Sequence, residues 1–399
     1  MRGRRPGAGG PVRGSTLSHA ERYLELGLRL GRHVDGLVDA YYGPPALKEQ
    51  VDAEDLVDTT RLAEDADALL GELPDGWLRD QVRGCATYAR VLAGEEISYA
   101  DEVEGCYGVR PQRTPVDVYE AVHAELEELL PGDGPLAERR QAWRTQHLVD
   151  GGLALAALED LLPLMRAHTN DLVELPPGER LTLEGVHDEP WWAFNYYQGD
   201  LESRVVLNID VPTTGYDLIR LAAHEAYPGH HTEHSVKEQR LFRDQGLVEE
   251  SIQLVPTPQA LLSEGIAETG IDEVLDEEAR AEAYSVLARH GIELDPGPTE
   301  RVAKVLERLG TAADDAALLI HEDGAPPEDA KRYLERWRLS TPEDAEQSVR
   351  FLTDPTWRAY AITYTAGETL CRAYVDGDPE RFRRLLTEHV RVGELLAAR

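Results

Sequence analysis

The sequence predicts a mainly α-helical fold with one small antiparallel β-sheet, and two patterns carry that prediction. Apolar residues recur about every 3.6 residues along most of the chain, as they do in helices that bury one face. Strand-like alternation is confined to a short stretch after residue 175. With 399 residues, of which 42% are hydrophobic, the chain can bury a large core.

Residues 16–174 are predicted to form an N-terminal helical region. Residues 138–170 are expected to form one long helix, or two helices with a break near Gly151-Gly152. Residues 1–15 are rich in Arg, Gly and Pro and lack the apolar segment of a signal peptide, so we expect a disordered tail. The other helices of this region are expected at 18–34, 56–73, 77–92 and 116–130.

Residues 175–399 are predicted to form a second region, joined to the first in one fold that contains a cleft. It begins with short β-type segments at 181–183, 191–197 and 203–210. The last of these leads into a helix for which Thr214 is the expected N-cap, with Asp217 in the first turn. The pattern after Glu268 is helical to the end of the chain.

Composition excludes several classes of partner. The net charge of −34 argues against nucleic acid, because phosphate contacts need clustered Lys and Arg. No run of about 18 apolar residues is present, so no membrane span is expected. Cys85, Cys106 and Cys371 are odd in number and widely spaced, which indicates reduced thiols and predicts a cytoplasmic location.

The stretch 224–231, His-Glu-Ala-Tyr-Pro-Gly-His-His, is the main candidate for a functional motif. The preceding helix is strongly apolar, so His224 and Glu225 are expected to be buried. A buried carboxylate without a partner is costly, and Glu225 therefore needs a cation, a metal-bound water or a hydrogen-bond donor. Metal binding meets this need.

The spacing of the histidines differs from the usual zinc motif, in which they lie four residues apart on one helix face. In an unbroken helix His231 would lie about 10.5 Å further along the axis than His224, too far to share one ion, and His230 would point away. Pro228 and Gly229 supply a disturbance that could bulge the helix and bring His230 round. Both histidines stay candidates on geometry.

A second acidic cluster lies about forty residues further on. Glu264 and Glu268 are four residues apart on a predicted helix over 261–274, so they share a face. One carboxylate could be the third ligand while the other orients a histidine ring. Two His and one Glu with an open position form a catalytic zinc site, and Glu225 beside the metal water would be the general base.

At these residues the chain resembles the bacterial domain-of-unknown-function family 885. Members carry H-E-A/G-x-P-G-H followed by E-G-x-A-x-x-x-E; residues 224–230 match the first motif, 264–267 match the start of the second, and Glu268 lies nearer than the usual second glutamate. A C-terminal P-x-x-x-x-Y…Y-x-x-G element is similar to 355–367. The likeness covers roughly residues 140–399.

The resemblance implies a helical zincin-like fold around a small sheet, one Zn²⁺ per chain and peptide hydrolysis, since members are described as zinc metallopeptidases. Residues 175–399 would then be the metallopeptidase-like catalytic region. Gluzincin peptidases, whose ligands are His, His and Glu, are the nearest mechanistic relatives. The dipeptidyl peptidase III type carries one extra residue between its histidines, and this analogy favours His230 over His231.

The resulting hypothesis assigns each candidate a role. The ligands are His224, His230 and Glu264, Glu225 is the base, and Tyr364 donates a hydrogen bond to the oxyanion. The strand 204–210 is expected to lie beside the cleft and to pair with an extended peptide. Alternative activities are hydrolysis of a non-peptide amide or ester, and metal-stabilised binding without turnover. The supporting residues are His231 and Glu268 as orienting or alternative ligands, and Arg204, Asn208 and Tyr360 as substrate contacts.

Overall fold

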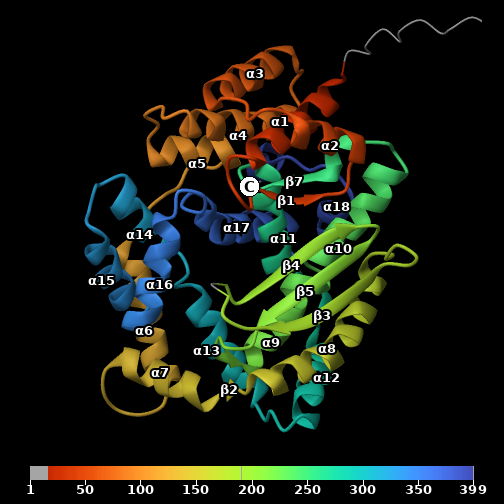
Figure 1. The fold of residues 1–399 in the computed structure, drawn as a ribbon. Coiled ribbons are helices and arrows are strands. Elements are labelled where there is room, and N and C mark those ends of the chain that lie inside the picture. The colour runs from red at the N-terminus through yellow and green to blue at the C-terminus, as the bar shows by residue number, and fades with distance from the viewer. Residues whose placement is uncertain (1–16, 190, 399) are drawn as a thin grey trace, which may run out of the picture.

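Helices make up most of the chain, as predicted, and the sheets are small (Figure 1). The structure, a computed structural model, describes residues 17–189 and 191–398. The predicted tail at 1–15 lies outside the described residues. In the part that is described, no helix is long and apolar enough to cross a membrane.

The N-terminal helices form a layer at the top of Figure 1. The first of them begins where the sequence predicts, because Ser18 accepts a hydrogen bond from the amide of Glu21 while the Glu21 side chain returns to the Ser18 amide. Leu and Tyr side chains such as Leu24 and Tyr23 are fully buried beneath this layer. The layer consists of α1 (His19–Gly31), α2 (Pro45–Ala53), α3 (Thr59–Glu72), α4 (Trp77–Leu92) and α5 (Tyr99–Tyr107).

The long helical pattern at 138–170 is two helices, the second of the two predicted arrangements. α7 (Leu136–Gln146) ends before the short strand β2 (Leu148–Val149), and α8 (Gly151–Leu172) begins after it. The Asp150 side chain accepts hydrogen bonds from the amides of Gly152 and Leu153, which caps α8 and separates it from α7. The break is therefore an N-cap that precedes the two glycines.

Three strands form the main sheet, in the order β3 (Arg180–Val186), β5 (Glu202–Asn208), β4 (Ala193–Gly199). β4 and β5 are an antiparallel hairpin, and β3 joins the other edge of β5 in parallel. The predicted pairing of strand 204–210 with an extended peptide is wrong, because both edges of β5 already bond to neighbouring strands. In the hairpin of β4 and β5, only β4 has an edge that is not paired within this sheet.

Two short strand pairs connect distant parts of the chain. β1 (Val38–Tyr41) pairs antiparallel with β7 (Ile252–Leu254), and β2 pairs antiparallel with β6 (Thr213–Thr214). Neither β1 nor β7 was predicted, because each is too short to show a period. The pairs link the predicted N-terminal helical region to residues 175–399.

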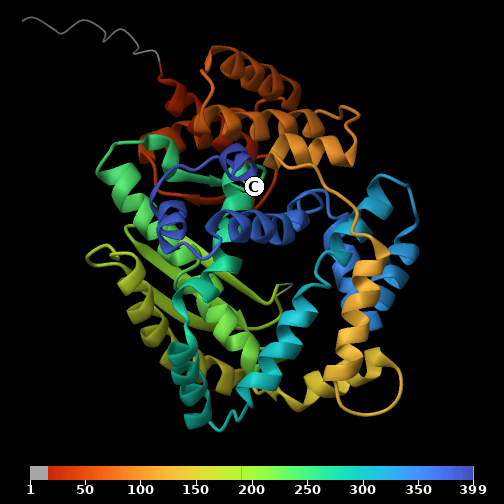
Figure 2. The same cartoon turned by 180° about the vertical axis from the view of Figure 1, so that it is seen from behind.

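The C-terminal part is helical, as predicted. Three of its helices, α14 (Ala312–His321), α15 (Pro327–Trp337) and α16 (Pro342–Thr353), pack together at one side of the molecule beside α6 (Val116–Leu129), as the two opposite views show (Figures 1 and 2). The Tyr119 hydroxyl of α6 donates to Asp315 of α14 at 2.8 Å. This part also contains α12 (Glu277–Arg289), α13 (Pro296–Glu307), α18 (Pro379–Thr387) and α19 (Val392–Ala397).

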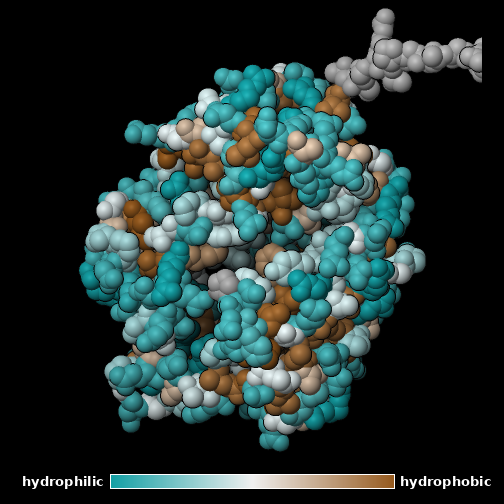
Figure 3. Space-filling model, in the orientation of Figure 1, coloured by the Kyte–Doolittle hydropathy of each residue, from teal (hydrophilic) through white to brown (hydrophobic). Residues whose placement is uncertain are grey.

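α11 (Pro258–Val274) and α17 (Thr363–Val375) cross at the centre of the molecule. The crossing is close because each helix presents a glycine: a Cβ on Gly265 would lie 2.4 Å from the Gly367 carbonyl oxygen, and one on Gly367 would lie 2.4 Å from the Leu261 carbonyl oxygen. Both glycines belong to the motifs on which the resemblance rests. The space-filling view is hollowed near the centre of the molecule, where Figure 1 draws α17 and the beginning of β4 (Figure 3).

Candidate metal centre

The helix that carries the first motif changes its winding at the motif. α9 (Gly215–Leu221) starts at the predicted N-cap, with the Thr214 and Asp217 side chains bonded to each other's amides. It widens into a π-helical turn over Ala222–Ala226, where the Tyr227 amide bonds to the Ala222 carbonyl at 3.0 Å. The helix then ends, and α10 (His230–Lys237) begins after Gly229. The predicted bulge is thus a π-turn followed by a break.

Pro228 and Gly229 fold the chain back onto the end of this turn. The Gly229 amide bonds to the Ala223 carbonyl at 2.8 Å, and a Cβ on Gly229 would lie 1.9 Å from the His224 carbonyl oxygen. Only glycine fits this approach. Pro228 fills a notch on α11, where a Cβ on Gly270 would lie 2.6 Å from the proline ring. These two contacts bring α10 beside the π-turn.

His224, His230 and Glu264 come together at this junction. The two Nε2 atoms lie 3.2 Å apart, and they lie 3.5 and 3.7 Å from the two carboxylate oxygens of Glu264. One nitrogen or oxygen from each residue lies within 4.8 Å of the other two, so the three could hold a metal ion. The Oε2 atom of Glu264 is buried and accepts no hydrogen bond, so it is available to coordinate a cation.

The second nitrogen of His224 is held by a carboxylate, as metal-binding histidines commonly are. Its Nδ1 atom lies 3.4 Å from Glu268 Oε1, and Arg220 donates to the other oxygen of Glu268 at 2.8 Å. Glu268 therefore lies where it can orient the His224 ring, which is one of the two roles predicted for it from the sequence. With Nδ1 held by an ionised acceptor, His224 turns its Nε2 atom toward His230 and Glu264.

The second nitrogen of His230 connects to a buried polar chain that was not predicted. Lys237 donates to Glu233 at 2.6 Å, and the Ser263 hydroxyl donates to the other oxygen of Glu233 at 2.6 Å. Since the hydroxyl proton is used there, His230 Nδ1, at 3.1 Å from Ser263 Oγ, is the donor. The Nε2 lone pair of His230 therefore also faces the junction.

Two lone pairs at this distance repel each other unless a proton or a metal cation lies between them. Burial alone would lower the pKa of His224, but the hydrogen bond to Glu268 and the charges of Glu268, Glu225 and Glu264 outweigh it and raise the pKa to about 9. Burial and the charge of His224 hold the pKa of His230 well below its usual value. At neutral pH His224 therefore donates a proton to neutral His230.

The carboxylic acids of the centre are held in different states. Burial raises the pKa of Glu264 to about 7 despite the charge of His224 and the hydroxyl of Tyr360. Burial also favours the protonated form of Glu268, but His224 and Arg220 overcome it and lower its pKa. Glu225 is 8% exposed, burial raises its pKa, and its backbone carbonyl accepts a 2.5 Å hydrogen bond from Asn195 of β4. Burial thus favours the protonated form of Glu225, as a group that must accept a proton from water requires.

Two tyrosines from the C-terminal motif line the centre. The Tyr360 hydroxyl donates to Glu264 Oε1, and its ring meets the ring of Tyr364 edge-on with centroids 5.7 Å apart. Tyr364 is 38% exposed, and burial together with the charges of Glu264 and Glu225 raises its pKa well above 10. Tyr360 thus orients a candidate ligand, whereas Tyr364 is partly exposed and keeps its hydroxyl protonated at neutral pH.

His231 lies apart from the three candidate ligands. Its Nδ1 atom is 2.8 Å from Ser203 Oγ and its Nε2 atom is 2.7 Å from Glu179 Oε2. Tyr227 and Arg166 also donate to Glu179, at 2.8 and 2.6 Å. Because both ring nitrogens are engaged and the side chain is fully buried, His231 ties α10 to the sheet.

The predicted substrate contacts Arg204 and Asn208 are engaged within the chain. Arg204 pairs with Glu184 at 3.1 Å, and its guanidinium lies 4.6 Å from the ring centre of Tyr196. Asn208 is 2% exposed, and its amide bonds to three backbone groups, the carbonyls of residues 189 and 191 and the amide of residue 210. Asn208 thus shapes the turns around β5.

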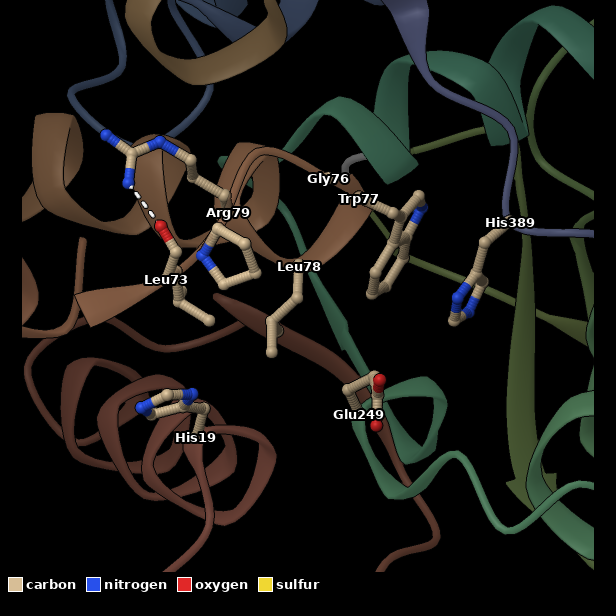
Figure 4. Close-up of a pocket in the computed structure, with 9 residues that line it drawn as sticks. His19, Leu73, Gly76, Trp77, Leu78, Arg79, Glu249 and His389 are labelled. Atoms are coloured by element: carbon tan, nitrogen blue, oxygen red, sulfur yellow. Dashed lines mark hydrogen bonds between the residues drawn. The ribbon is translucent and has the colours of Figure 1, made fainter. Parts of the chain in front are cut away.

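A pocket of about 370 Å³ opens elsewhere, between α1, α4 and the C-terminal segment (Figure 4). Trp77 and His389 stack face to face at 3.8 Å on one side of it, and His389 bonds to the buried Glu250 at 2.6 Å. None of its lining residues belongs to the metal centre. Its two histidines and its glutamate do not belong to the group that could hold a metal ion among the described residues.

Comparisons with known proteins inform the fold. No family model matches the sequence, and no curated protein matches it. Among solved structures, a "putative lipoprotein" from Colwellia psychrerythraea has a TM-score of 0.53 at 14% identity over 88% of this chain, which covers 64% of that chain. A "putative lipoprotein of unknown function" from Shewanella oneidensis has a TM-score of 0.47 at 13% identity, over 92% of this chain and 68% of that chain. The first of these structures shares the fold of this chain. This chain covers less than two thirds of the length of that protein.

Proposed function

We propose that the chain is a zinc-dependent metallohydrolase that cleaves peptide bonds. The observation that supports this most is the meeting of the Nε2 atoms of His224 and His230, 3.2 Å apart, with the buried, unbonded Oε2 atom of Glu264. Two His and one Glu are the donor set of catalytic zinc sites, which keep a further position open. A bound Zn²⁺ supplies Lewis acidity and lowers the pKa of a coordinated water.

The residues around this donor set support hydrolysis. Glu225 accepts a proton from the attacking water and passes it to the leaving amine, which its raised pKa favours. Tyr364 donates a hydrogen bond to the substrate carbonyl oxygen as negative charge develops on it. Glu268 and Ser263 hold the two imidazoles, and Tyr360 holds Glu264.

Peptides are the proposed substrate because the motifs at 224–230, 264–267 and 355–367 are similar to those of a family described as zinc metallopeptidases. A non-peptide amide or ester could be attacked by the same groups. The fold alone does not choose between these substrates.

Metal analysis and a peptide library test the proposal together. We expect about one zinc per chain and cleavage of library peptides, detected by mass spectrometry. Glu225→Gln should keep its zinc and lose about 10²- to 10⁴-fold in kcat, whereas Glu278→Gln, an exposed glutamate on α12, should behave as wild type. Zinc binding without cleavage of any peptide would exclude peptide hydrolysis, and full activity of Glu225→Gln would remove Glu225 from its role.

A further inference from the structure

Asp39 lies on β1 at an irregularity in the strand pairing. Val38 is opposite Leu254 and Ala40 is opposite Gln253, so Asp39 is an extra residue that β7 does not match. Such a bulge redirects a side chain out of the regular pleat, and bulges are common beside active sites. Ala40 is buried and Asp39 is half-buried. The backbone therefore presents Asp39 separately from the strand's core-facing side chain.

The bulge lies between β7 and the edge of the main sheet. β1 packs beside β4 (Figure 1), and Tyr42, just after β1, meets Tyr197 of β4 edge-on with ring centroids 5.5 Å apart. β4 is the strand whose Asn195 holds the backbone of Glu225. β4 therefore contacts both the strand that carries Asp39 and the backbone of the proposed base, Glu225.

The groups around Asp39 come from the metal centre. Its charge acts on the hydroxyls of Tyr360 and Tyr364, which line the centre, and of Tyr196 on β4. Burial and the charge of Glu225 raise the pKa of Asp39 to about 7. Because β1 packs beside β4, the charge of Asp39 acts on both the proposed base and the proposed oxyanion donor.

No side chain among residues 17–189 and 191–398 neutralises Asp39. No ion pair or hydrogen bond of its carboxylate is present there. The arginines of α9 and β5 pair with other carboxylates: Arg220 with Glu268 and Glu307, Arg204 with Glu184. A half-buried carboxylate without a cation is unfavourable. Asp39 is not among the three residues that could hold a metal ion.

We propose that Asp39 is a specificity-determining residue that binds a cationic group of the substrate, an ammonium or guanidinium, at the β1 side of the metal centre. The inference rests on the proposed function. An ammonium ion offers the donors that an unpaired carboxylate lacks. The net charge of −34 also favours the approach of cationic substrates. The cation would come from the free amino terminus of a peptide or from a basic side chain.

Three hydroxamates, which bind zinc through the same headgroup, distinguish these sources. Leucine hydroxamate carries a free α-ammonium group, Nα-acetyl-lysine hydroxamate carries only a side-chain ammonium group, and N-acetyl-leucine hydroxamate carries neither. Their dissociation constants for the zinc-loaded protein are measured by calorimetry. We expect one of the cationic probes to bind about 10- to 100-fold more tightly than the neutral probe.

Asp39→Asn should remove this advantage while leaving zinc content and the affinity for the neutral probe unchanged, which also shows that the variant folds. Asp35→Asn, which changes an exposed carboxylate four residues earlier, should keep the advantage. Equal affinity of all three probes for wild type, or an undiminished advantage in Asp39→Asn, would overturn the inference and leave the proposed function intact. Loss of a second metal ion in Asp39→Asn would also overturn it. Failure of all three probes to bind would contradict the proposed function itself.

Discussion

At the scale of single residues, each histidine of the motif is defined by the partners of its two ring nitrogens. His224 and His230 each use Nδ1 for an acceptor, Glu268 or Ser263, and direct Nε2 to the same point. His231 uses both nitrogens for Ser203 and Glu179. The adjacent residues His230 and His231 therefore differ in role: His230 faces the metal centre, and His231 holds α10 against the sheet.

The Ser263 hydroxyl is the link that fixes the tautomer of His230. In Ser263→Ala the Nδ1 atom of His230 loses its acceptor, so we expect zinc affinity to fall about 10- to 100-fold. Competition with a chromogenic chelator measures the change. Ser285→Ala, which removes a hydroxyl bonded within α12, is the control and should bind zinc as wild type does. Unchanged affinity in Ser263→Ala would show that the buried chain does not orient the ring.

Tyr364 tests the proposed stabilisation of the oxyanion. Tyr364→Phe removes one hydroxyl from a 38% exposed ring, so folding and zinc content should not change. Because the hydrogen bond strengthens only as charge develops on the carbonyl oxygen, kcat should fall about 10²- to 10³-fold with little change in KM. Steady-state kinetics on a cleaved library peptide gives both constants. A rise in KM at constant kcat would instead make Tyr364 a binding residue.

At the scale of secondary-structure elements, the centre depends on how two helices are joined. The π-turn at Ala222–Ala226 and the return at Gly229 convert a spacing of six residues into a contact between imidazoles. The sequence indicates the disturbance, since Pro228 and Gly229 both break helices. It does not indicate its form, because the return depends on Gly270 of α11, which receives the proline ring.

Gly229→Ala tests the join directly. The new Cβ would lie 1.9 Å from the His224 carbonyl oxygen. The chain reversal at Gly229 must therefore change its backbone conformation, which moves His230 away from His224. We expect loss of zinc binding and a decrease of about 1–3 kcal/mol in the free energy of unfolding. Gly71→Ala on α3 is the matched control, because nothing lies within 4 Å of its added Cβ. Stoichiometric zinc in Gly229→Ala would contradict the described join.

The helices were largely predictable and the smallest strands were not. The period identified α4 with its observed ends and α6 to within one residue, because each buries one continuous face. β1 and β7 are four and three residues long and pair across more than 200 positions, which no local pattern encodes. Asp39 could not be assigned for the same reason, since its placement depends on that pairing.

At the scale of the whole molecule, buried polar contacts hold the centre against the rest of the fold. Glu179, just before β3, receives hydrogen bonds from Arg166 of α8 and from Tyr227 between the two motif helices, and contacts His231 of α10. Burial disfavours its charge, but the bonds from His231 and Tyr227 outweigh this effect and lower the pKa of Glu179 from 4.5 to about 2.

This shift predicts a pH dependence of stability. A carboxyl group whose pKa is lower in the folded state stabilises the fold above pH 4.5, and its contribution disappears as the pH falls toward 2. The contribution is about 3 kcal/mol. Urea denaturation between pH 2 and 7 should show that wild type is more stable than Glu179→Gln at neutral pH and that the difference narrows below pH 4.5. A constant difference would contradict the assignment.

The candidate ligands could be found from the sequence because chemistry and spacing are local there. His224, His230 and Glu264 lie in two short motifs. Ser263 precedes Glu264 directly and Glu233 follows His230 by one helical turn, but many serines and glutamates have such neighbours. Their link to His230 requires α10 and α11 to be packed together, so only the folded chain reveals it.

Zinc content of the purified chain tests the central claim most directly. Three proteins are compared after zinc loading and desalting: wild type, His230→Ala and His187→Ala, the last removing an exposed histidine paired with Asp210. We expect about one zinc per chain in wild type and His187→Ala, and little or none in His230→Ala. Equal zinc in all three, or none in wild type, would contradict it.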